Sequence, residues 1–418
     1  MEQQQSRLPV SQDIVLKCGN TMGKAKEERN IKASCVDRWL QIILKSGIKE
    51  LDLCMPMFMK EKYSFPCSVF SDEEAATSIQ TLRLFDCHLN PTSTLSHLRR
   101  LTRLQLSSVR ITDEELGLLL SRTSALEQLD LLSCSGIIRL RIPCTLQQLN
   151  SLCIIECLTM LQVVEIDAPN LCSFRCGSIR FDRTQIEIST RNSSQLKNVN
   201  LDRILLLCHA RARLPSIAGN VERLTMRSSD ENVNIPMLPS KLPCLGHLEI
   251  ILVSRTVIFP RDYILSLVSF LNASPTLDTF ILRLGQCALT SDLDVGDDDD
   301  EYVRRKQERR YDQLRQVTIM GFCASKSLVE LTSHIIESAP SLERLTLDTT
   351  YDYDTRSGTT SKCPSSTKTS QCSPLSDMDL AGARKAVEAA RRYIAGRVPS
   401  TVLFEVLEPC NVCHSSDQ

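Results

Sequence analysis

The stretch LEQLDLLSC, residues 126–134, has leucines at its first, fourth and sixth positions and a cysteine at its ninth. Counted from the first residue, these are offsets 0, 3, 5 and 8. The same spacing of apolar residues and cysteine occurs in IQTLRLFDC, residues 79–87, and in LNSLCIIEC, residues 149–157. A phrase that recurs in this way predicts a repeat protein, because each copy buries its apolar side against the next copy.

The apolar triplet at offsets 0, 3 and 5 recurs with a nearly constant period. Copies that begin between residues 79 and 245 follow one another at spacings of 22 to 25 residues, which is typical of leucine-rich repeats. Offsets 3 and 5 lie on one face of a short strand, so stacked copies form a parallel sheet with a continuous core. The sequence therefore predicts an α/β leucine-rich-repeat solenoid, in which a curved parallel sheet has a helical or irregular convex side. The triplets begin at Ile48, Ile79, Leu101, Leu126, Leu149, Leu171, Leu196, Val221, Leu245, Leu277, Leu314 and Leu342, and an extra half-length phrase, LQVVEI, occupies residues 161–166.

The residue at offset 8 follows the strand, where the backbone bends. A small buried donor at this position can satisfy the backbone groups that the bend leaves without partners. We therefore interpret Cys87, Cys134 and Cys157 as structural residues and not as reactive thiols.

The side chains between the core positions point outward, onto the concave face of the sheet. The offset-6 residues of neighbouring repeats form a column, and we expect Arg83 and Arg103 beside it. Apolar anchors flanked by arginine are typical of an interface hot spot. The alternative is that the loop after each strand covers offset 6 and makes these side chains part of the core. The candidate partner-binding residues are Phe85, Leu132, Ile155, Arg83 and Arg103.

Several return segments have the pattern of helices. Residues 112–122 begin with a capping box formed by Thr112 and Glu115, and residues 261–275 and 327–340 are apolar segments that end before a proline. Each of these segments is expected to cover the convex side of the sheet.

One further helix is expected before the first repeats, at residues 34–47. Its Val36, Trp39, Leu40 and Ile43 lie on one apolar face. Such a face suits a helix that caps the open end of the stack.

The composition excludes several classes of function. The 418 residues carry 49 basic and 50 acidic side chains, a formal net charge of −1, which gives no overall attraction to nucleic acid or to an anionic membrane. No uncharged apolar run approaches the roughly 18–20 residues that a membrane-spanning helix needs. The 19 cysteines, without a secretion signal, indicate reduced thiols. We expect an intracellular protein, cytoplasmic or nuclear, that binds neither nucleic acid nor membrane.

The sequence has no recognisable catalytic motif, and we predict a protein that is not an enzyme and holds no cofactor or metal. The C-terminal CNVCH, with Cys410, Cys413 and His414, has the spacing of a haem-attachment signature and contains zinc-ligand residue types. The simpler interpretation is a solvated or packed tail. Residues 291–313 join an acidic and a basic run; this segment is either a nuclear-localisation or nucleic-acid patch or a solvated insertion.

Beyond the repeat, several phrases resemble the plant F-box/LRR/FBD family. The resemblance covers roughly residues 34–414. It rests on VDRWLQIILKSGIKELDL (36–53), VVEIDAPNLCSFRCGS (163–178), FLNASPTLDTFILRL (270–284), LVELTSHIIESAPSLERLTLD (328–348) and ARRYIAGRVPSTVLFEVLEPC (390–410).

The resemblance implies the target-recognition part of a substrate receptor in an SCF ubiquitin ligase, which binds a target protein of unknown identity. In that family an N-terminal F-box binds a Skp-type adaptor. Here LPVSQDIVL, residues 8–16, is not followed by an apolar helical run, so we expect no F-box and no adaptor binding. The alternative is a free-standing scaffold or decoy that does not join a ligase.

The resemblance and the repeat pattern together predict the division of the chain. The expected parts are a disordered N-terminal tail without an F-box (1–33), leucine-rich repeats (34–290), a charged insertion (291–313), FBD-like last repeats (314–350), a flexible linker (351–378), and a C-terminal helix and strand (379–418).

Overall fold

The structure is a computed structural model that divides into two compact units, unit 1 (Met1–Leu196) and unit 2 (Lys197–Gln418). The described residues are 13–17, 33–45, 47–56, 61–71, 73–92, 95–157, 160–177, 186–191, 193–204, 206–207, 214, 217, 219–229, 241–253, 261–285, 310–349 and 377–409.

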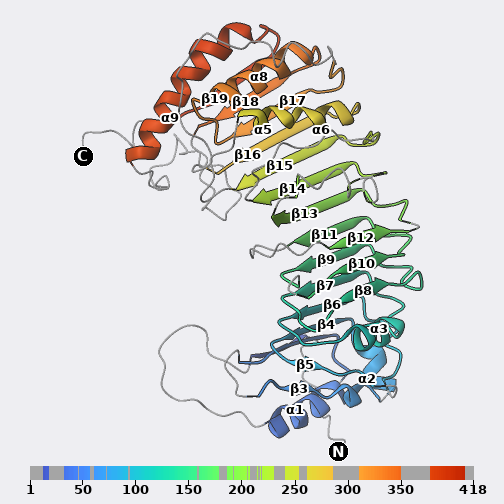
Figure 1. Cartoon of the computed structure of the whole chain (residues 1–418). Helices are drawn as coiled ribbons and strands as arrows, with labels where there is room; N and C mark the ends of the chain where they lie inside the picture. The colour runs from blue at the N-terminus through green and yellow to red at the C-terminus, as the bar shows by residue number, and fades with distance from the viewer. Residues whose placement is uncertain are drawn as a thin grey trace, which may run out of the picture. The chain divides into compact units, whose positions relative to one another are not determined.

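Unit 1 is built on a parallel sheet with one strand per repeat (Figure 1). The residues at offsets 0, 3 and 5 form its core; in the repeat of Leu126, Leu129 and Leu131 they are completely buried. The predicted α/β leucine-rich-repeat architecture is therefore confirmed. In spatial order the strands are β1 (Asp13–Lys17), β2 (Glu50–Cys54), β4 (Thr81–Phe85), β6 (Arg103–Ser107), β7 (Gln128–Leu132), β9 (Ser151–Ile155) and β11 (Ser173–Gly177).

Four successive repeats of unit 1 end their strands in the same way. The residue at offset 7 has a positive φ of 53° to 58°, although none of the four is glycine. Its N–H donates to the carbonyl of the next strand, as Ser133 does to Ile155 over 2.7 Å, so the hydrogen-bond ladder continues through the turn. The left-handed residue turns the chain towards the interior, so the residue at offset 8 is buried in the core. The four residues are Asp86, Ser108, Ser133 and Glu156.

The return side of unit 1 is partly a second sheet, which the sequence analysis did not predict. The order of its strands is β12 (Glu187–Thr190), β10 (Val163–Ile166) and β8 (Arg139–Ile142). The half-length phrase noted above forms β10. Its alternating burial has the period of a strand, and a return segment this short leaves little room for a helix. A smaller sheet pairs β3 (Ser64–Phe65) with β5 (His88–Leu89).

The helix predicted in the repeat of Leu101 is present as α3 (Asp113–Ser121). Its capping box forms as predicted: the Glu115 N–H donates to Thr112 Oγ1 over 3.3 Å, and the Thr112 N–H donates to Glu115 Oε2 over 2.8 Å. Two further short helices of unit 1 are η1 (Cys67–Phe70) and α2 (Glu73–Ser78).

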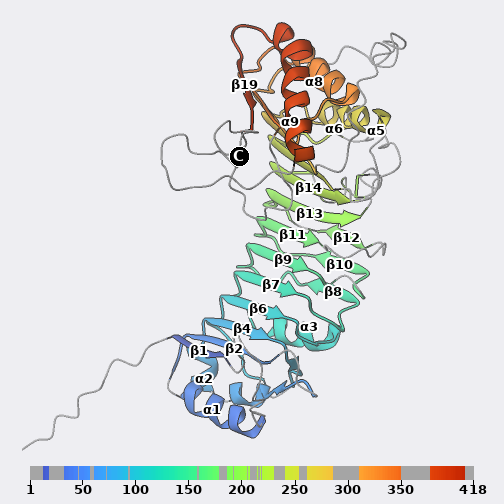
Figure 2. The same ribbon diagram turned by 90° about the vertical axis from the view of Figure 1, so that its left-hand side faces the viewer.

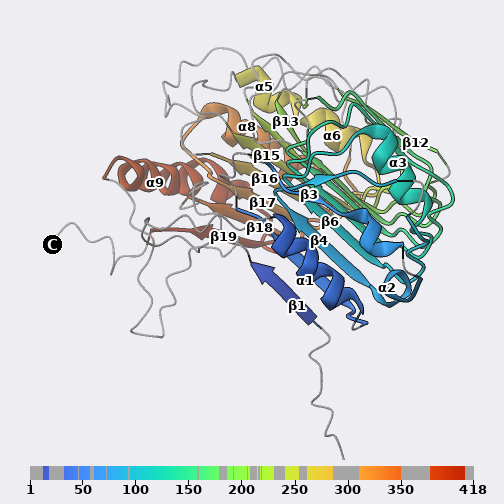
Figure 3. The ribbon, with the colours of Figure 1, turned by 90° about the horizontal axis from the view of Figure 1, so that it is seen from below.

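The N-terminal end of unit 1 differs from the prediction in two ways. Part of the expected disordered tail, Asp13–Lys17, is strand β1, which pairs in parallel with β2. Helix α1 (Ala33–Lys45) lies at this end of the sheet beside β1 (Figure 3). Its buried residues are Val36, Leu40 and Leu44. Val36 and Leu40 were expected on the buried face, but Leu44 takes the place of Trp39 and Ile43, so the buried face is rotated relative to the prediction. Gly47, with φ of 71°, ends the helix.

Unit 2 repeats the same parallel arrangement. Its last helix, α9 (Asp377–Ala389), and last strand, β19, lie near each other at the C-terminal end of the sheet (Figure 2). Gly321, at offset 7 of its repeat, again has a positive φ, of 76°. In order the strands are β13 (Asn198–Ile204), β14 (Arg223–Ser229), β15 (His247–Val253), β16 (Thr279–Leu284), β17 (Gln316–Met320), β18 (Arg344–Asp348) and β19 (Leu403–Leu407).

The predicted helices of unit 2 are present. Residues 261–275 form α5 (Arg261–Ser266) and α6 (Val268–Ala273), and residues 327–340 form α8 (Lys326–Ser338). Helix α9 continues as a π-helical turn (Ala390–Ile394) and a 3-10 turn (Ala395–Arg397).

Three segments singled out from the sequence lie wholly or mostly outside the described residues. They are the charged insertion up to residue 309, the linker up to residue 376 and the Cys410–His414 motif. The end of the predicted insertion is folded, because Tyr311 is only 8% exposed.

Candidate protein-binding surface

The outward-facing residues of the unit 1 sheet form columns, because neighbouring strands pair in register. At offset 6, Phe85 is the partner of Ser107, Ser107 of Leu132, and Leu132 of Ile155. Cys54 precedes Phe85 in the same column. We call Cys54, Phe85, Ser107, Leu132 and Ile155 the offset-6 strip.

The offset-6 strip is neither exposed nor part of the core. All five side chains are half-buried, whereas the offset-5 residues that precede them on the strands are buried. The offset-6 side chains are therefore less buried than the core residues beside them and stay partly open to solvent. The strip is mostly apolar, and strands about 4.8 Å apart place its side chains within contact distance of one ligand surface.

Polar residues border the strip on both sides. On the strands, offset 4 carries Arg83, Gln105 and Asp130. After the strands, the left-handed residues at offset 7 form a second polar row. An apolar centre with a polar rim is the usual anatomy of a protein–protein interface.

The two candidate arginines lie differently from the prediction. Arg83 is on the same strand as Phe85, but its guanidinium bonds the Asp52 carboxylate over 2.8 Å and lies 3.5 Å from Glu50. Arg103 is exposed at offset 2, beside Thr81 and four residues from the strip along its own strand. At about 3.3 Å per residue, that is about 13 Å. Arg103 is therefore not beside the apolar column.

Sequence reasoning missed one residue at this border. The Lys62 ammonium forms an ion pair with Asp86 over 2.9 Å and donates to the Ser108 carbonyl over 3.2 Å. It thereby connects two left-handed turns next to the offset-6 strip. Lys62 lies in the segment before β3 and outside the repeat phrase, so the periodic pattern gives no signal for it.

Asp130 has an environment suited to a recognition residue. It accepts a hydrogen bond from Gln128 Nε2 over 2.7 Å, and burial raises the pKa of its carboxyl above the ordinary value, although the Gln128 bond opposes that shift. A carboxylate has about four acceptor sites, so the Gln128 bond leaves others that can accept further hydrogen bonds. Asp130 is thus a fixed acceptor next to the apolar strip.

The offset-8 cysteines are structural, as predicted. Cys87, Cys134 and Cys157 are at most 2% exposed. The Cys134 thiol donates to the Leu106 carbonyl over 3.2 Å, and the Cys157 thiol donates to the Leu131 carbonyl over 3.4 Å. Burial, with Asp86 nearby, raises the pKa of the Cys87 thiol to about 12. The Cys87 thiol therefore stays protonated at neutral pH, and the thiol bonds of Cys134 and Cys157 connect adjacent repeats.

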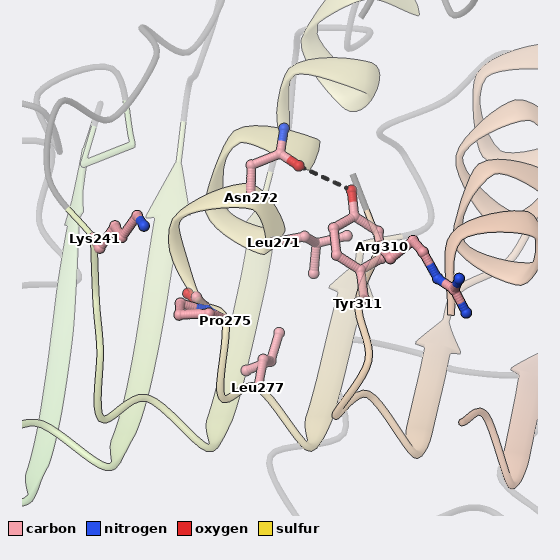
Figure 4. Close-up of a pocket in the computed structure, with 8 residues that line it drawn as sticks. Lys241, Leu271, Asn272, Pro275, Leu277, Arg310 and Tyr311 are labelled. Carbon is pink, nitrogen blue, oxygen red and sulfur yellow. Dashed lines mark hydrogen bonds between the residues drawn. The ribbon is translucent and has the colours of Figure 1, made fainter. Parts of the chain in front are cut away.

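Unit 2 contains a cavity of about 200 Å³ before the strands β15–β17 (Figure 4). The Tyr311 hydroxyl donates to Asn272 Oδ1 over 3.2 Å and lies 3.0 Å from His334 Nε2. These bonds join protein groups to one another and fix the segment before β17 against α6, so we assign the cavity to the packing of unit 2. It is lined by Lys241, Leu271, Asn272, Ser274, Pro275, Leu277, Arg310 and Tyr311.

Among the described residues, no group of three or more His, Cys, Asp or Glu side chains is placed to hold a metal ion. None of the helices in the described part of the chain has the length and apolar character needed to cross a membrane.

A family model described as "At1g61320/AtMIF1, LRR domain" matches residues 15–411. The chain belongs to this leucine-rich-repeat family. The match begins within β1 and ends beyond β19, so the At1g61320/AtMIF1-type LRR domain includes both units. A comparison with curated proteins found no match. An LRR domain is a fold whose stacked strands present an extended surface, which indicates protein–protein interaction.

Proposed function

We propose that the protein is a non-catalytic binding module and that the offset-6 strip of unit 1 holds a target protein. The observation that carries the proposal is the in-register apolar column of Phe85, Leu132 and Ile155, half-buried and bordered by polar residues. Apolar anchors at the centre of a polar rim supply most of the binding energy in many interfaces. With a balanced net charge, a protein partner fits this surface better than nucleic acid or a membrane.

We further propose that the bound target is directed to ubiquitin-dependent turnover, as in the target-recognition part of an SCF substrate receptor. The resemblance of the repeat and C-terminal phrases to F-box/LRR/FBD proteins supports this role. None of the twelve cysteines that the structure describes forms a disulfide, which supports an intracellular site of action, cytoplasmic or nuclear.

A second candidate function is that of a scaffold or decoy that holds the target without a ligase. One observation favours it. Residues 13–17 overlap the LPVSQDIVL phrase, and they form strand β1 of the repeat sheet and not the helix that would follow an F-box start. Residues 13–17 therefore complete the LRR sheet.

Calorimetry with a purified Skp-type adaptor separates the two functions. Binding at micromolar concentration assigns the chain to a ligase, whereas no heat of binding, together with target capture in a pull-down, assigns it to the scaffold class. A pull-down in which the double variant Phe85→Ser/Leu132→Ser captures the same partners as the natural protein would contradict the proposed surface in either case.

A further inference from the structure

Helix α1 leaves its outer face without apolar cover from the described residues. Trp39 is 43% exposed and Ile42 is 63% exposed, although large apolar side chains elsewhere in unit 1 are mostly buried. The opposite face of the helix, with Val36, Leu40 and Leu44, is at most 2% exposed and fixes α1 to unit 1. The exposed pair is therefore held in place by a rigid helix.

The exposed residues form one stripe along the helix. Cys35, Trp39 and Ile42 are spaced i, i+4 and i+7, and Arg38 and Lys45 lie in the same stripe, one turn before and one turn after Ile42. All five side chains are exposed. We call them the α1 stripe. Anchors at this spacing are the form in which one amphipathic helix binds another.

The charges on the stripe have one sign. Arg38 and Lys45 are both basic, and the helix has no acidic residue in its first turn. The single acidic residue of α1, Asp37, is turned away and accepts a hydrogen bond from the Tyr63 hydroxyl over 2.6 Å. An exposed tryptophan and isoleucine between two cations complement a surface that is apolar at its centre and acidic at its borders.

From these observations we propose that the α1 stripe is a second docking surface, independent of the offset-6 strip, and that it binds an acidic amphipathic helix of a partner protein. A second copy of the chain is a poorer occupant. Two α1 helices packed on each other would place Arg38 against Arg38 or against Lys45, and like charges in contact oppose association. An anionic membrane is also a poorer occupant, because amphipathic-helix insertion scales with buried apolar area and this stripe supplies two large apolar side chains.

Trp39 is the single tryptophan of the chain and serves as an intrinsic fluorescence probe of the α1 stripe. Tryptophan emission therefore reports on the α1 stripe and on no other part of the protein. The full-length protein is titrated with an amphipathic helical peptide that has leucines at i, i+4 and i+7 and glutamates beside them. A matched peptide has lysine in place of each glutamate.

The acidic peptide is expected to shift the Trp39 emission to shorter wavelength in a saturable way, and the basic peptide is not. Ile42→Ser should weaken acidic-peptide binding at least about tenfold, because it removes a central anchor. The double variant Arg38→Glu/Lys45→Glu should exchange the preference and bind the basic peptide. Ile138→Ser, which changes another exposed isoleucine of unit 1, 44% exposed, is the matched control and should bind like the natural protein.

Several outcomes would overturn the proposal. They are no emission shift with either peptide, an equal shift with both, or a charge-reversed variant that keeps the original preference. An emission shift with anionic vesicles but not with the acidic peptide assigns the stripe to a membrane. A shift that depends only on protein concentration, with a dimer in sedimentation, assigns it to a second copy. Loss of target capture by the offset-6 variants does not affect these measurements. The proposals for the offset-6 strip and for the α1 stripe are therefore tested independently.

Discussion

The backbone N–H of Cys134 donates a hydrogen bond to the Sγ atom of Cys157, one repeat further along, over 3.2 Å. Each thiol also donates back to a carbonyl of the preceding strand, that of Leu106 for Cys134 and of Leu131 for Cys157. The Cys157 side chain thus satisfies a donor and an acceptor of the preceding repeat, the Cys134 N–H and the Leu131 carbonyl. The Cys157 sulfur atom therefore links two successive repeats of the sheet.

Cys157→Ala should therefore destabilise the protein by about 1–3 kcal/mol, because the buried Cys134 N–H loses its acceptor. Cys134→Ser is expected to cost about 1–2 kcal/mol, since a more polar group is buried in the same place. Urea denaturation measures both values. The exposed Cys144→Ala is the control and should change stability little; equal effects of Cys144→Ala and Cys157→Ala would rule out the link.

The buried thiols should make stability fall at alkaline pH. The pKa of Cys87 is raised in the folded protein from 9.0 to about 12, so the folded state holds this proton more tightly than the unfolded state. Its contribution is complete below about pH 9 and is lost as the pH rises towards 12. The urea midpoint should drop as the pH rises from 9 towards 12, and by less in Cys87→Ala. Iodoacetamide should modify the exposed Cys35 in the native protein well before Cys87.

Acid should weaken unit 2 through its histidines. Burial lowers the pKa of His334 below its ordinary value, although Glu337 opposes this, and burial and Arg223 lower the pKa of His247. The unfolded state therefore binds the proton more tightly, and stability is complete above about pH 6.5 and is lost as the pH falls below it. The denaturation midpoint should fall between pH 7 and pH 5, and less in His334→Gln. A drop of the same size in that variant and in His247→Gln would show that other groups cause it.

Gly321→Ala should be strongly destabilising. A Cβ atom at this position would lie 2.2 Å from the Leu284 carbonyl oxygen, and the φ of 76° is unfavourable for any residue with a side chain. The two effects together are expected to cost about 2–4 kcal/mol. Gly47→Ala is the matched control, because its φ is 71° but nothing lies within 4 Å of the added atom. Thermal unfolding should show a cost of only about 1 kcal/mol there.

The double variant Phe85→Ser/Leu132→Ser tests the offset-6 strip. Because both side chains are half-buried and face outward, their loss should abolish target capture and lower the melting temperature only slightly. Leu131→Ser is the contrasting variant, since it changes a completely buried neighbour and should unfold the repeat. A large fall in the melting temperature of the double variant would show that Phe85 and Leu132 belong to the core.

The sequence was sufficient for the sheet, because its period is carried by apolar residues that must be buried together. Leu126, Leu129 and Leu131 can be identified as core from spacing alone. The convex sheet was missed since β10 and its neighbours are only four residues long, too short for a period to separate strand from loop.

The candidate site was predicted in part. The offset-6 column follows from strand alternation, but Arg103 was placed beside it although the two outward positions are on the same strand and far apart. Arg83 was expected beside the column, and its bond with Asp52 was not predicted because it depends on which strands are neighbours. Lys62 and the burial of α1 depend on loop paths and on helix rotation, which a single sequence does not define.

The left-handed turns at offset 7 have an evolutionary consequence. Their N–H groups continue the ladder through main-chain atoms, and the strands are held by residues on the buried face. The register of the sheet thus does not depend on what the outward side chains are. Substitutions at offsets 4 and 6 can then accumulate at little cost to folding. A duplicated gene can therefore acquire a new partner by changing one face of the protein while the other face is conserved.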